Sequence, residues 1–416
     1  MPRPPKKFVA DPFEYHEEIE LRIDSLSNTG LGVGRVPGVG PGATEGGNAG
    51  GWVVFVPFCL PGERVRARVF RNEKNCSHAD LVEVLDASPD RREARCQLFG
   101  TCGGCQYQHL DYAAQLEWKT RQVAELLRHM AGIEHDVNPC RPSPKIWNYR
   151  SKITPHFKKV RDGKPEEIGF LSFGNRFRIV DVPQCLIAME TINEALPKVR
   201  EEARSRTWKR GATLLLRAAG GRVETNPNMP VREEVGGLCF DFLAGDFFQN
   251  NPFILPDFVG YAADRAAAPP VRFLVDAYCG SGLFALSLAR HFEHVAGVEI
   301  SESAVDWARR NAETNGIANA RFLAASAEAV FADIDFPPAE TCVLIDPPRK
   351  GSTPGFLDQL AAFRPARILY VSCNPATQIR DLTHLRQHGY RLLDAQPFDL
   401  FPHTRHLESI MTMETT

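Results

Sequence analysis

The stretch RFLVDAYCGSGLFALSLARHF, residues 272–292, decides the fold of the last part of the chain. It opens with an apolar run typical of a buried strand, which ends at Asp276. Gly280 and Gly282 come next, and glycines let the backbone turn tightly beneath a ligand before a helix begins. The stretch therefore predicts a strand, a ligand-binding turn and a helix. The glycines alone fit a site for NAD as well as one for S-adenosylmethionine.

Strand-like and helical stretches alternate after this point. The apolar runs are HVAGVEI (294–300), TCVLID (341–346) and RILYVSC (367–373), and helical patterns separate them. This alternation predicts an α/β fold, a doubly wound Rossmann-like domain with a mostly parallel sheet. We expect Ser303 with Asp306 to cap the helix that follows the first of these runs.

Acidic and reactive residues stand where these predicted strands end. They are Asp276, Glu299, Asp346 and Cys373. The carboxyl ends of parallel strands line the ligand crevice of a doubly wound sheet, so we expect all of them on one rim. Glu299 stands where an acidic residue can accept hydrogen bonds from ribose hydroxyls, although it would also fit as a mere strand end. An Asn-Pro turn signal follows Cys373 and predicts that its thiol reaches an exposed edge.

Length and charge limit the class of protein. The chain has 416 residues and a formal net charge of −2, so an RNA partner would need local basic patches. No apolar run approaches the roughly 18 residues of a membrane span, and the first residues are too polar for a signal peptide. We therefore expect a cytoplasmic protein, a monomer, with no membrane partner.

The chain divides into three predicted domains, 1–90, 91–235 and 236–416. The first contains short strand-like runs, IELRIDSL, GWVVFVPF, ERVRARVF and ADLVEVL, which predict a small β-barrel. The second opens with a cysteine cluster and continues through a helical stripe, YAAQLEWKTRQVAELLRHMAG, to short strands such as GFLSF and FRIVDV. The third is the α/β domain.

The cysteine cluster predicts a metal site. In the stretch RCQLFGTCGGCQYQH, the residues Cys96, Cys102 and Cys105 have the spacing C-x5-C-G-G-C, and Cys185 is a plausible distant fourth. Four thiolates hold either a tetrahedral zinc ion or an iron–sulfur cluster, and the spacing does not decide between them.

Five stretches carry a resemblance to a known family: DAYCGSGLFAL, GVEISESAVDWARRNAETNG, LIDPPRKG, YVSCNPATQIRDL and FPHTRHLES. In them the chain is similar to the catalytic domain of RNA 5-methyluridine methyltransferases, which belong to the class I S-adenosylmethionine-dependent methyltransferases. The stretch IDSLSNTGLGVGRV, followed by VFVPFCLPGERVRARV, resembles a TRAM domain, an OB-like RNA-binding barrel. Arginines near its strands, and the run RSRTWKRG further on, are candidates for phosphate contacts.

The resemblance assigns roles to two residues. It implies that the thiolate of Cys373 adds to carbon 6 of uracil, which makes carbon 5 nucleophilic, and that Glu408 later removes the proton from carbon 5. Without the resemblance, Glu408 would be taken as a solvated surface carboxylate. A free thiol has a pKa of about 8.5, so we expect the site to lower the pKa of Cys373 or to supply a base.

The resemblance also implies a ligand set for each cofactor. For S-adenosylmethionine it points to the residues Gln249, Tyr278, Gly280, Glu299 and Asp346. Leu283 stands where relatives have an asparagine, which removes a polar contact and is similar to the eukaryotic tRNA branch of the family. For the four cysteines the resemblance implies a [4Fe-4S] cluster and makes zinc the less favoured occupant.

We therefore expect methylation of carbon 5 of one uridine in structured RNA, either 23S rRNA or tRNA. The TRAM domain and the cysteines favour rRNA, whereas the leucine in the glycine turn favours tRNA. Two alternatives stay open. A methyltransferase acting on an exocyclic amine would usually carry an aromatic residue after Pro-Pro, but Arg349 stands there. A catalytically inactive, cluster-bearing RNA-binding protein would not need Cys373 and Glu408.

Overall fold

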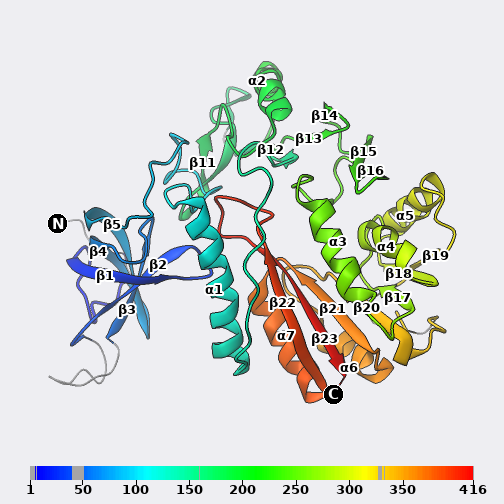
Figure 1. Cartoon of the computed structure of the whole chain (residues 1–416). Coiled ribbons are helices and arrows are strands. Elements are labelled where there is room, and N and C mark those ends of the chain that lie inside the picture. Colours follow the sequence, from blue (N-terminus) through cyan, green and yellow to red (C-terminus); the bar gives the residue numbers. More distant parts are fainter. Residues whose placement is uncertain are drawn as a thin grey trace. The chain divides into compact units, whose positions relative to one another are not determined.

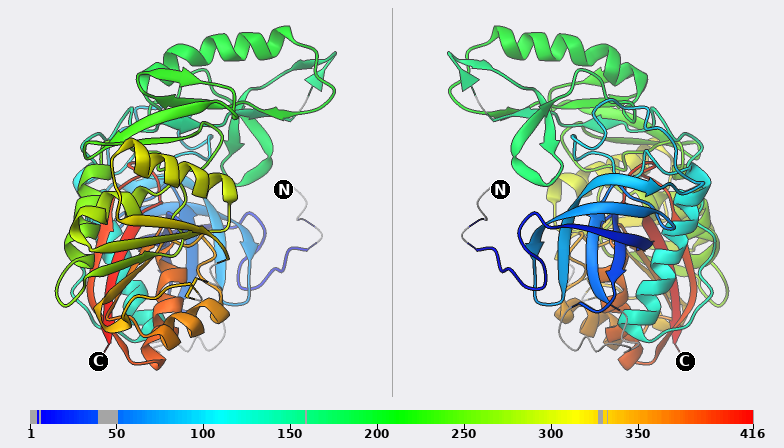
Figure 2. Two further views of the ribbon diagram at one scale, coloured as in Figure 1. Left: turned by 90° about the vertical axis from the view of Figure 1, so that its right-hand side faces the viewer. Right: turned by 90° about the vertical axis from the view of Figure 1, so that its left-hand side faces the viewer.

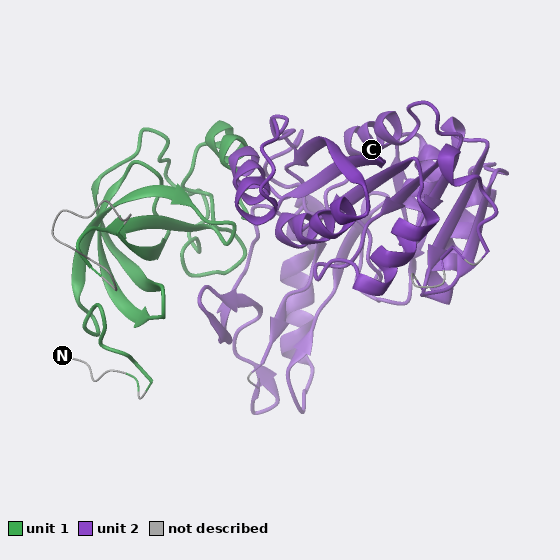
Figure 3. Ribbon diagram, turned by 90° about the horizontal axis from the view of Figure 1, so that it is seen from below, with its two compact units in different colours: residues 1–118, 403–405 green, residues 119–402, 406–416 purple. Residues whose placement is uncertain are grey.

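A computed structural model describes residues 5, 7–39, 51–158, 160–326, 330–331 and 333–415. The chain divides into two compact units, shown in different colours in Figure 3. Unit 1 comprises residues 1–118 and 403–405, and unit 2 comprises residues 119–402 and 406–416.

Unit 1 contains the predicted barrel. Its strands close in the order β1-β2-β3-β5-β4, and their inward residues alternate with outward ones around an apolar core. The bounds are β1 (Glu18–Leu26), β2 (Leu31–Val36), β3 (Trp52–Pro57), β4 (Arg64–Asn72) and β5 (Cys76–Asp86). The strand β2 was not among the predicted runs, because its glycines resemble a turn. A Cβ at Gly32 would lie 2.5 Å from the Cys59 sulfur, and one at Gly34 would lie 2.4 Å from a backbone oxygen. At both positions neighbouring atoms of the barrel come too close to leave room for a side chain, so glycine is required.

The predicted helix α1 (Tyr112–Ala131) is present, and its second half belongs to unit 2. Small antiparallel sheets and one helix follow in unit 2 (Figure 1). They consist of β6 (Lys152–Ile153), β7 (His156–Phe157), β8 (Val160–Arg161), β9 (Lys164–Pro165), β10 (Gly169–Ser172), β11 (Asn175–Asp181), α2 (Glu190–Ser205), β12 (Ala212–Thr213), β13 (Leu216–Ala219), β14 (Arg222–Glu224), β15 (Pro230–Val235) and β16 (Leu238–Leu243).

The rest of unit 2 is built on a sheet of seven described strands in the order β19-β18-β17-β20-β21-β23-β22. The first five are parallel, and β23 lies antiparallel between β21 and β22. This confirms the predicted doubly wound fold, and the strand order reverses direction between β17 and β20. The strands are β17 (Phe273–Asp276), β18 (His294–Glu299), β19 (Ala320–Ala324), β20 (Thr341–Ile345), β21 (Arg367–Ser372), β22 (Tyr390–Phe398) and β23 (Glu408–Thr415).

Helices cover both faces of this sheet (Figure 1; Figure 2). One apolar cluster joins α3, α4 and α5 to one face, and another joins the second half of α1, α6 and α7 to the other. The elements are α3 (Leu255–Ala266), α4 (Leu283–Leu288), α5 (Glu302–Thr314), α6 (Pro354–Phe363), α7 (Pro375–Gln387) and the short 3₁₀ turns η1 (Ala289–His291) and η3 (Pro338–Glu340).

One predicted helix cap is wrong by two residues. The N-cap of α5 is Ser301, whose hydroxyl accepts the N–H of Ala304, whereas Ser303 lies inside the first turn. The Ser301 backbone is extended, as an N-cap requires, because β18 has ended only two residues earlier.

Candidate active site

The predicted rim residues lie at the carboxyl ends of neighbouring strands. Asp276 ends β17 and Glu299 ends β18, while Asp346 and Cys373 directly follow β20 and β21. These strands are parallel neighbours, so the four positions share one edge of the sheet. The edge includes the point between β17 and β20 where the strand order reverses, which is where ligands bind in open α/β sheets.

The glycine turn forms a cradle at this edge. Gly280 and Gly282 have φ of 51° and 94°, a backbone region that favours glycine, and a Cβ at Gly280 would meet no heavy atom within 4 Å. The Glu299 carboxylate braces the turn, because it accepts the N–H of Gly280 at 3.2 Å and the N–H of Ser301 at 3.0 Å. A carboxylate can accept further hydrogen bonds, so Glu299 keeps capacity for the hydroxyls of a ligand.

Asp276 lies buried beneath the cradle. Its Oδ2 accepts the N–H of Ala285 at 3.0 Å, whereas its Oδ1 is buried without a hydrogen-bond partner in the described part of the chain. Burial raises the pKa of Asp276 to about 7. Burial also raises the pKa of the neighbouring Cys279 thiol well above its ordinary value, so this cysteine is neutral and structural.

The pairing of β21 with β23 brings Cys373 and Glu408 together. Ser372 pairs with Ser409 across the antiparallel ladder, so the residues just beyond each, Cys373 and Glu408, come opposite one another at its end. Glu408 is only 4% exposed, which rules out the alternative of a solvated surface carboxylate. Burial raises the pKa of Glu408 well above its ordinary value, and the nearby Asp346 carboxyl raises it further.

Of the two routes expected to activate Cys373, a lowered thiol pKa or a base, the lowered pKa is not found. Burial, with a smaller contribution from Glu408, raises the pKa of the thiol to about 11. Arg349 opposes this shift by its charge and by a side-chain hydrogen bond to Cys373. The pKa of Asp346 is also raised to about 7, by desolvation and then by Asp276. Desolvation at this edge therefore favours the protonated forms of Asp276, Asp346 and Glu408.

Arg349 is a candidate site residue that the sequence analysis did not assign. It stands in the loop after β20, and this loop is docked on the start of α7: Asn374 Nδ2 and Thr377 Oγ1 donate to the Arg349 carbonyl at 3.0 and 3.2 Å. Arg380 donates to the next carbonyl, of Lys350, at 3.0 Å. The sequence feature that could have identified Arg349 is its position: it is a cation directly after Pro-Pro, in the loop that follows Asp346.

Two buried side chains fix the strand ends that carry the pair. Gln378 Nε2 donates to the carbonyls of Tyr370 at 2.7 Å and Ser409 at 3.2 Å, and so joins β21 to β23. Asp381 accepts the Tyr370 hydroxyl at 2.7 Å and the N–H of Ser352 at 2.8 Å, which ties the loop after β20 to the same place. The thiol and the carboxyl are therefore set by a rigid frame.

Gln249 and Tyr278 are two further residues predicted to contact the methyl donor. Gln249 is buried in the segment between β16 and α3, where Lys152 donates to the carbonyls of Gly245 at 2.7 Å and Asp246 at 3.0 Å. Tyr278 is half-buried and packs edge-on against Phe356, with ring centres 5.5 Å apart. Their roles toward a ligand stay predictions. Leu283, at the start of α4, is buried in the apolar core.

The predicted cluster cysteines lie in two parts of the chain. Cys96, Cys102 and Cys105 are half-buried on the turns between β5 and α1 in unit 1. Cys185 is half-buried before α2 in unit 2, where the Asn193 side chain bonds to both its N–H and its carbonyl. The joint site of four thiols stays a prediction.

No helix in the described ranges is both long and apolar enough to cross a membrane.

Comparisons with known proteins give one consistent result. Residues 228–416 match the family model described as tRNA (uracil-5-)-methyltransferase, and residues 13–82 match the TRAM domain model. The chain is 41% identical to the tRNA (uracil(54)-C(5))-methyltransferase of Schizosaccharomyces pombe, over 97% of this chain and 79% of the relative. It is 33% identical to the enzyme of the same name from Saccharomyces cerevisiae, over 96% of this chain and 74% of the relative.

A solved structure supports the fold. The crystal structure of the Pyrococcus abyssi tRNA (uracil-54, C5)-methyltransferase in complex with S-adenosyl-L-homocysteine superposes with a TM-score of 0.69. The alignment covers 95% of this chain and 100% of that one, at 24% sequence identity.

Proposed function

The chain belongs to the tRNA (uracil-5-)-methyltransferase family, and from this premise we propose that it methylates carbon 5 of uridine 54 in tRNA through a covalent bond to Cys373. Its activity as an RNA (uracil-C5-)-methyltransferase follows from that membership. The observation that supports the covalent route is the placement of Cys373 opposite Glu408, with Arg349 bonded to the thiol, at the edge that carries the glycine cradle.

The cradle fits S-adenosylmethionine. A ligand with ribose hydroxyls suits the remaining capacity of Glu299 and the open space above Gly280. When bound, S-adenosylmethionine supplies an electrophilic methyl group on a positively charged sulfonium. We assign its binding to Gly280 and Glu299 together with Gln249, Tyr278 and Asp346. Leu283 takes part only through packing, because its side chain lies in the core.

In the first step Cys373 acts on the base. Its thiolate forms a bond to carbon 6 of uracil, and the electrons of the 5,6 double bond move to carbon 5 and the carbonyl at carbon 4. Arg349 favours the thiolate through its hydrogen bond and charge. Carbon 5 then takes the methyl group, and the electron pair of the broken carbon–sulfur bond stays on the donor sulfur, which leaves as a neutral thioether.

In the last step Glu408 acts as a base. Carbon 5 now carries both a methyl group and a proton, and removal of the proton returns the electron pair to the 5,6 double bond and expels the Cys373 thiolate. Glu408 must be ionised for this step. Glu408 loses its proton when a positively charged donor binds at this edge, because that charge lowers the pKa of both Glu408 and Asp346. The charge is gone once carbon 5 is methylated, which raises the pKa of Glu408 again and makes its carboxylate a stronger base for the proton on carbon 5.

The choice of tRNA rests on the relatives, two of which are named for uracil 54 of tRNA. The test is methyl transfer to a tRNA transcript, to the same transcript with cytidine at that position, and to a 23S rRNA fragment. Nucleoside analysis should find 5-methyluridine only in the first. Methylation of the rRNA fragment alone would refute the tRNA assignment, and methylated adenine or cytosine would refute uracil chemistry altogether.

For the cysteines we propose a [4Fe-4S] cluster held by Cys96, Cys102, Cys105 and Cys185, with zinc as the less favoured occupant. The donor set supports this proposal, because four thiolates suit either group. Such a group would stabilise the fold, because metal binding is coupled to folding. We further propose the division into a TRAM barrel (1–90) that contacts RNA, a cluster domain (91–235) and a catalytic domain (236–416). Because Cys373, Glu408 and the cradle come from one unit of one chain, the enzyme is proposed to act as a monomer.

A further inference from the structure

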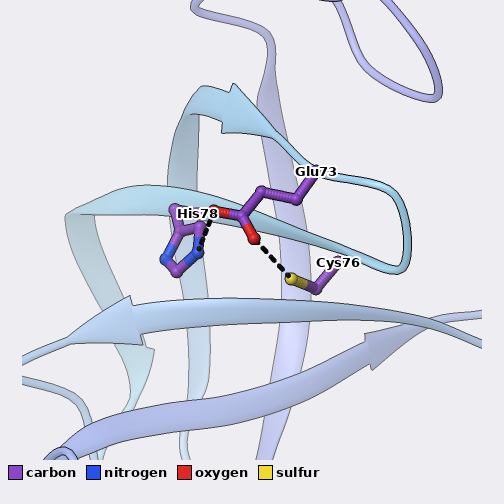
Figure 4. Close-up of side chains that lie close together, drawn as sticks. All are labelled: Glu73, Cys76 and His78. Carbon is purple, nitrogen blue, oxygen red and sulfur yellow. Dashed lines mark hydrogen bonds and ion pairs between the residues drawn. The ribbon is translucent and has the colours of Figure 1, made fainter.

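The hairpin between β4 and β5 of the barrel gathers three metal-ligating side chains that the methylation chemistry does not use. They are Glu73 in the turn after β4, and Cys76 and His78 on β5. Figure 4 shows the carboxylate of Glu73 between the thiol and the imidazole. One donor atom from each residue lies within 4.8 Å of the others.

The local fold explains why these side chains meet. Cys76 and His78 are two residues apart on one strand, so they point to the same side of it. Ser77, between them, points into the barrel, where it is fully buried and accepts the indole N–H of Trp52 at 2.8 Å. Cys76 and His78 therefore face outward. The N–H of Glu73 donates to the Cys76 carbonyl at 2.8 Å and closes the turn, which places the carboxylate over the same face.

The distances fit a tetrahedral ion. Zinc bonds of about 2.3 Å to sulfur and about 2.0–2.2 Å to nitrogen and oxygen put neighbouring donors roughly 3.5 Å apart. Glu73 Oε1 lies 3.5 Å from His78 Nε2, and Glu73 Oε2 lies 4.0 Å from the Cys76 sulfur. The two distances involve different oxygens of the Glu73 carboxylate, so closing the site around one ion requires a side-chain rotation. The imidazole is held by stacking on Phe55, with ring centres 5.3 Å apart.

We propose that Glu73, Cys76 and His78 bind a divalent transition-metal ion of the zinc class. Thiolate and imidazole ligands select zinc over calcium or magnesium, which prefer oxygen ligands. Within the described residues the group offers three ligands, which leaves the fourth position of the ion to water. The ion would join the two sides of the hairpin.

One contact competes with the ion. Arg71 forms an ion pair with Glu73 at 2.6 Å, and its charge disfavours a cation nearby. Both side chains are more than a third exposed, and exposed ion pairs contribute little, so the ion displaces Arg71 at small cost.

The test is titration of the full chain with Co²⁺, a spectroscopic substitute for Zn²⁺ that absorbs strongly when a thiolate binds it. The variants are Cys76→Ser and His78→Gln, and the matched control is Cys239→Ser, a half-buried cysteine outside the group. Every variant keeps the other possible metal ligands, which are the group Asp358, His384 and His388 and the cysteines between β5 and α1. Any cobalt that these residues bind is therefore the same in each variant and in the control.

We expect Cys76→Ser to lose one equivalent of thiolate-bound cobalt relative to Cys239→Ser. We expect His78→Gln to weaken that site roughly 100-fold or more, because even an outer-shell partner of a metal is worth about 10–100-fold. Zn²⁺ should also raise the unfolding midpoint of the wild type more than that of Cys76→Ser. Equal cobalt stoichiometry and equal spectra for Cys76→Ser and Cys239→Ser would overturn the proposal. None of these readouts depends on methylation.

Discussion

Replacing Arg349 with methionine removes a positive charge that lowers the pKa of the Cys373 thiol, and it should make that thiol a weaker acid. A hydrogen bond to a charged group contributes about 1.5–3 kcal/mol when it is shielded from solvent. Arg349 is exposed, so screening reduces this to about 1.4 kcal/mol, which is roughly one pKa unit. The thiolate fraction of Cys373 near neutral pH should then fall about tenfold.

The measurable effect is smaller than the change in thiolate fraction. A thiolate becomes about threefold more nucleophilic for each unit of added pKa, since the Brønsted coefficient is about 0.4–0.5. Alkylation of Cys373 by iodoacetamide, followed by mass spectrometry of the peptide that contains it, should therefore slow about threefold in Arg349→Met. Because a shorter side chain can also open access to the thiol, the rate is measured over a range of pH. The rise in rate with pH should move to higher pH.

Lys350→Met is the matched control. Lys350 is the next residue in the same loop and is exposed, but it is not among the charges that shift the pKa of Cys373. Its alkylation profile should match the wild type. If Arg349→Met and Lys350→Met gave the same profile, the assignment of Arg349 as the residue that favours the thiolate would be wrong.

Three further results are expected. Cys373→Ala should abolish methylation and leave S-adenosylmethionine affinity nearly unchanged in a binding titration. Covalent activation is worth several powers of ten, so activity above about 1% of wild type would contradict the nucleophile assignment. The stability that these acids contribute should be lost as pH rises from about 4 to about 7, because Asp276 and Asp346 have pKa values raised from 3.8 to about 7 and hold their protons more tightly when folded. Asp346→Asn should flatten this dependence in thermal unfolding scans, and an unchanged pH dependence in that variant would contradict it. Anaerobically purified protein should be brown with about four irons per chain, Cys102→Ser should lose colour and stability together, and stoichiometric zinc without iron would favour the other occupant.

The positions of the rim residues were predictable because each residue stands at the end of a predicted strand, and the ends of parallel strands share one edge of a sheet. A strand that ends at Asp276, and another that ends at Glu299, must share an edge once both lie parallel in one sheet. The same reasoning placed Asp346 and Cys373 at that edge. Local patterns also predicted α1 and most of the barrel strands.

The neighbours of these residues were not predictable in the same way. Glu408 meets Cys373 because β23 lies between β21 and β22, and the strand order of a sheet is set by long-range packing. Arg349 reaches the thiol because a loop docks on the start of α7 through side-chain bonds to its carbonyls. The direction of the Cys373 pKa depends on burial, which a linear sequence does not display.

The measurement that tests the covalent route most directly uses Glu408→Gln with unmodified tRNA and S-adenosylmethionine. Glutamine is a far poorer base than glutamate, so this variant should form the bond to carbon 6, transfer the methyl group and then stall. The account predicts a protein–RNA species that survives denaturation, carries one added methyl group and maps to Cys373 by peptide mass spectrometry. The double variant Cys373→Ala with Glu408→Gln should give none. Free turnover by Glu408→Gln, or an adduct on any other residue, would contradict the account.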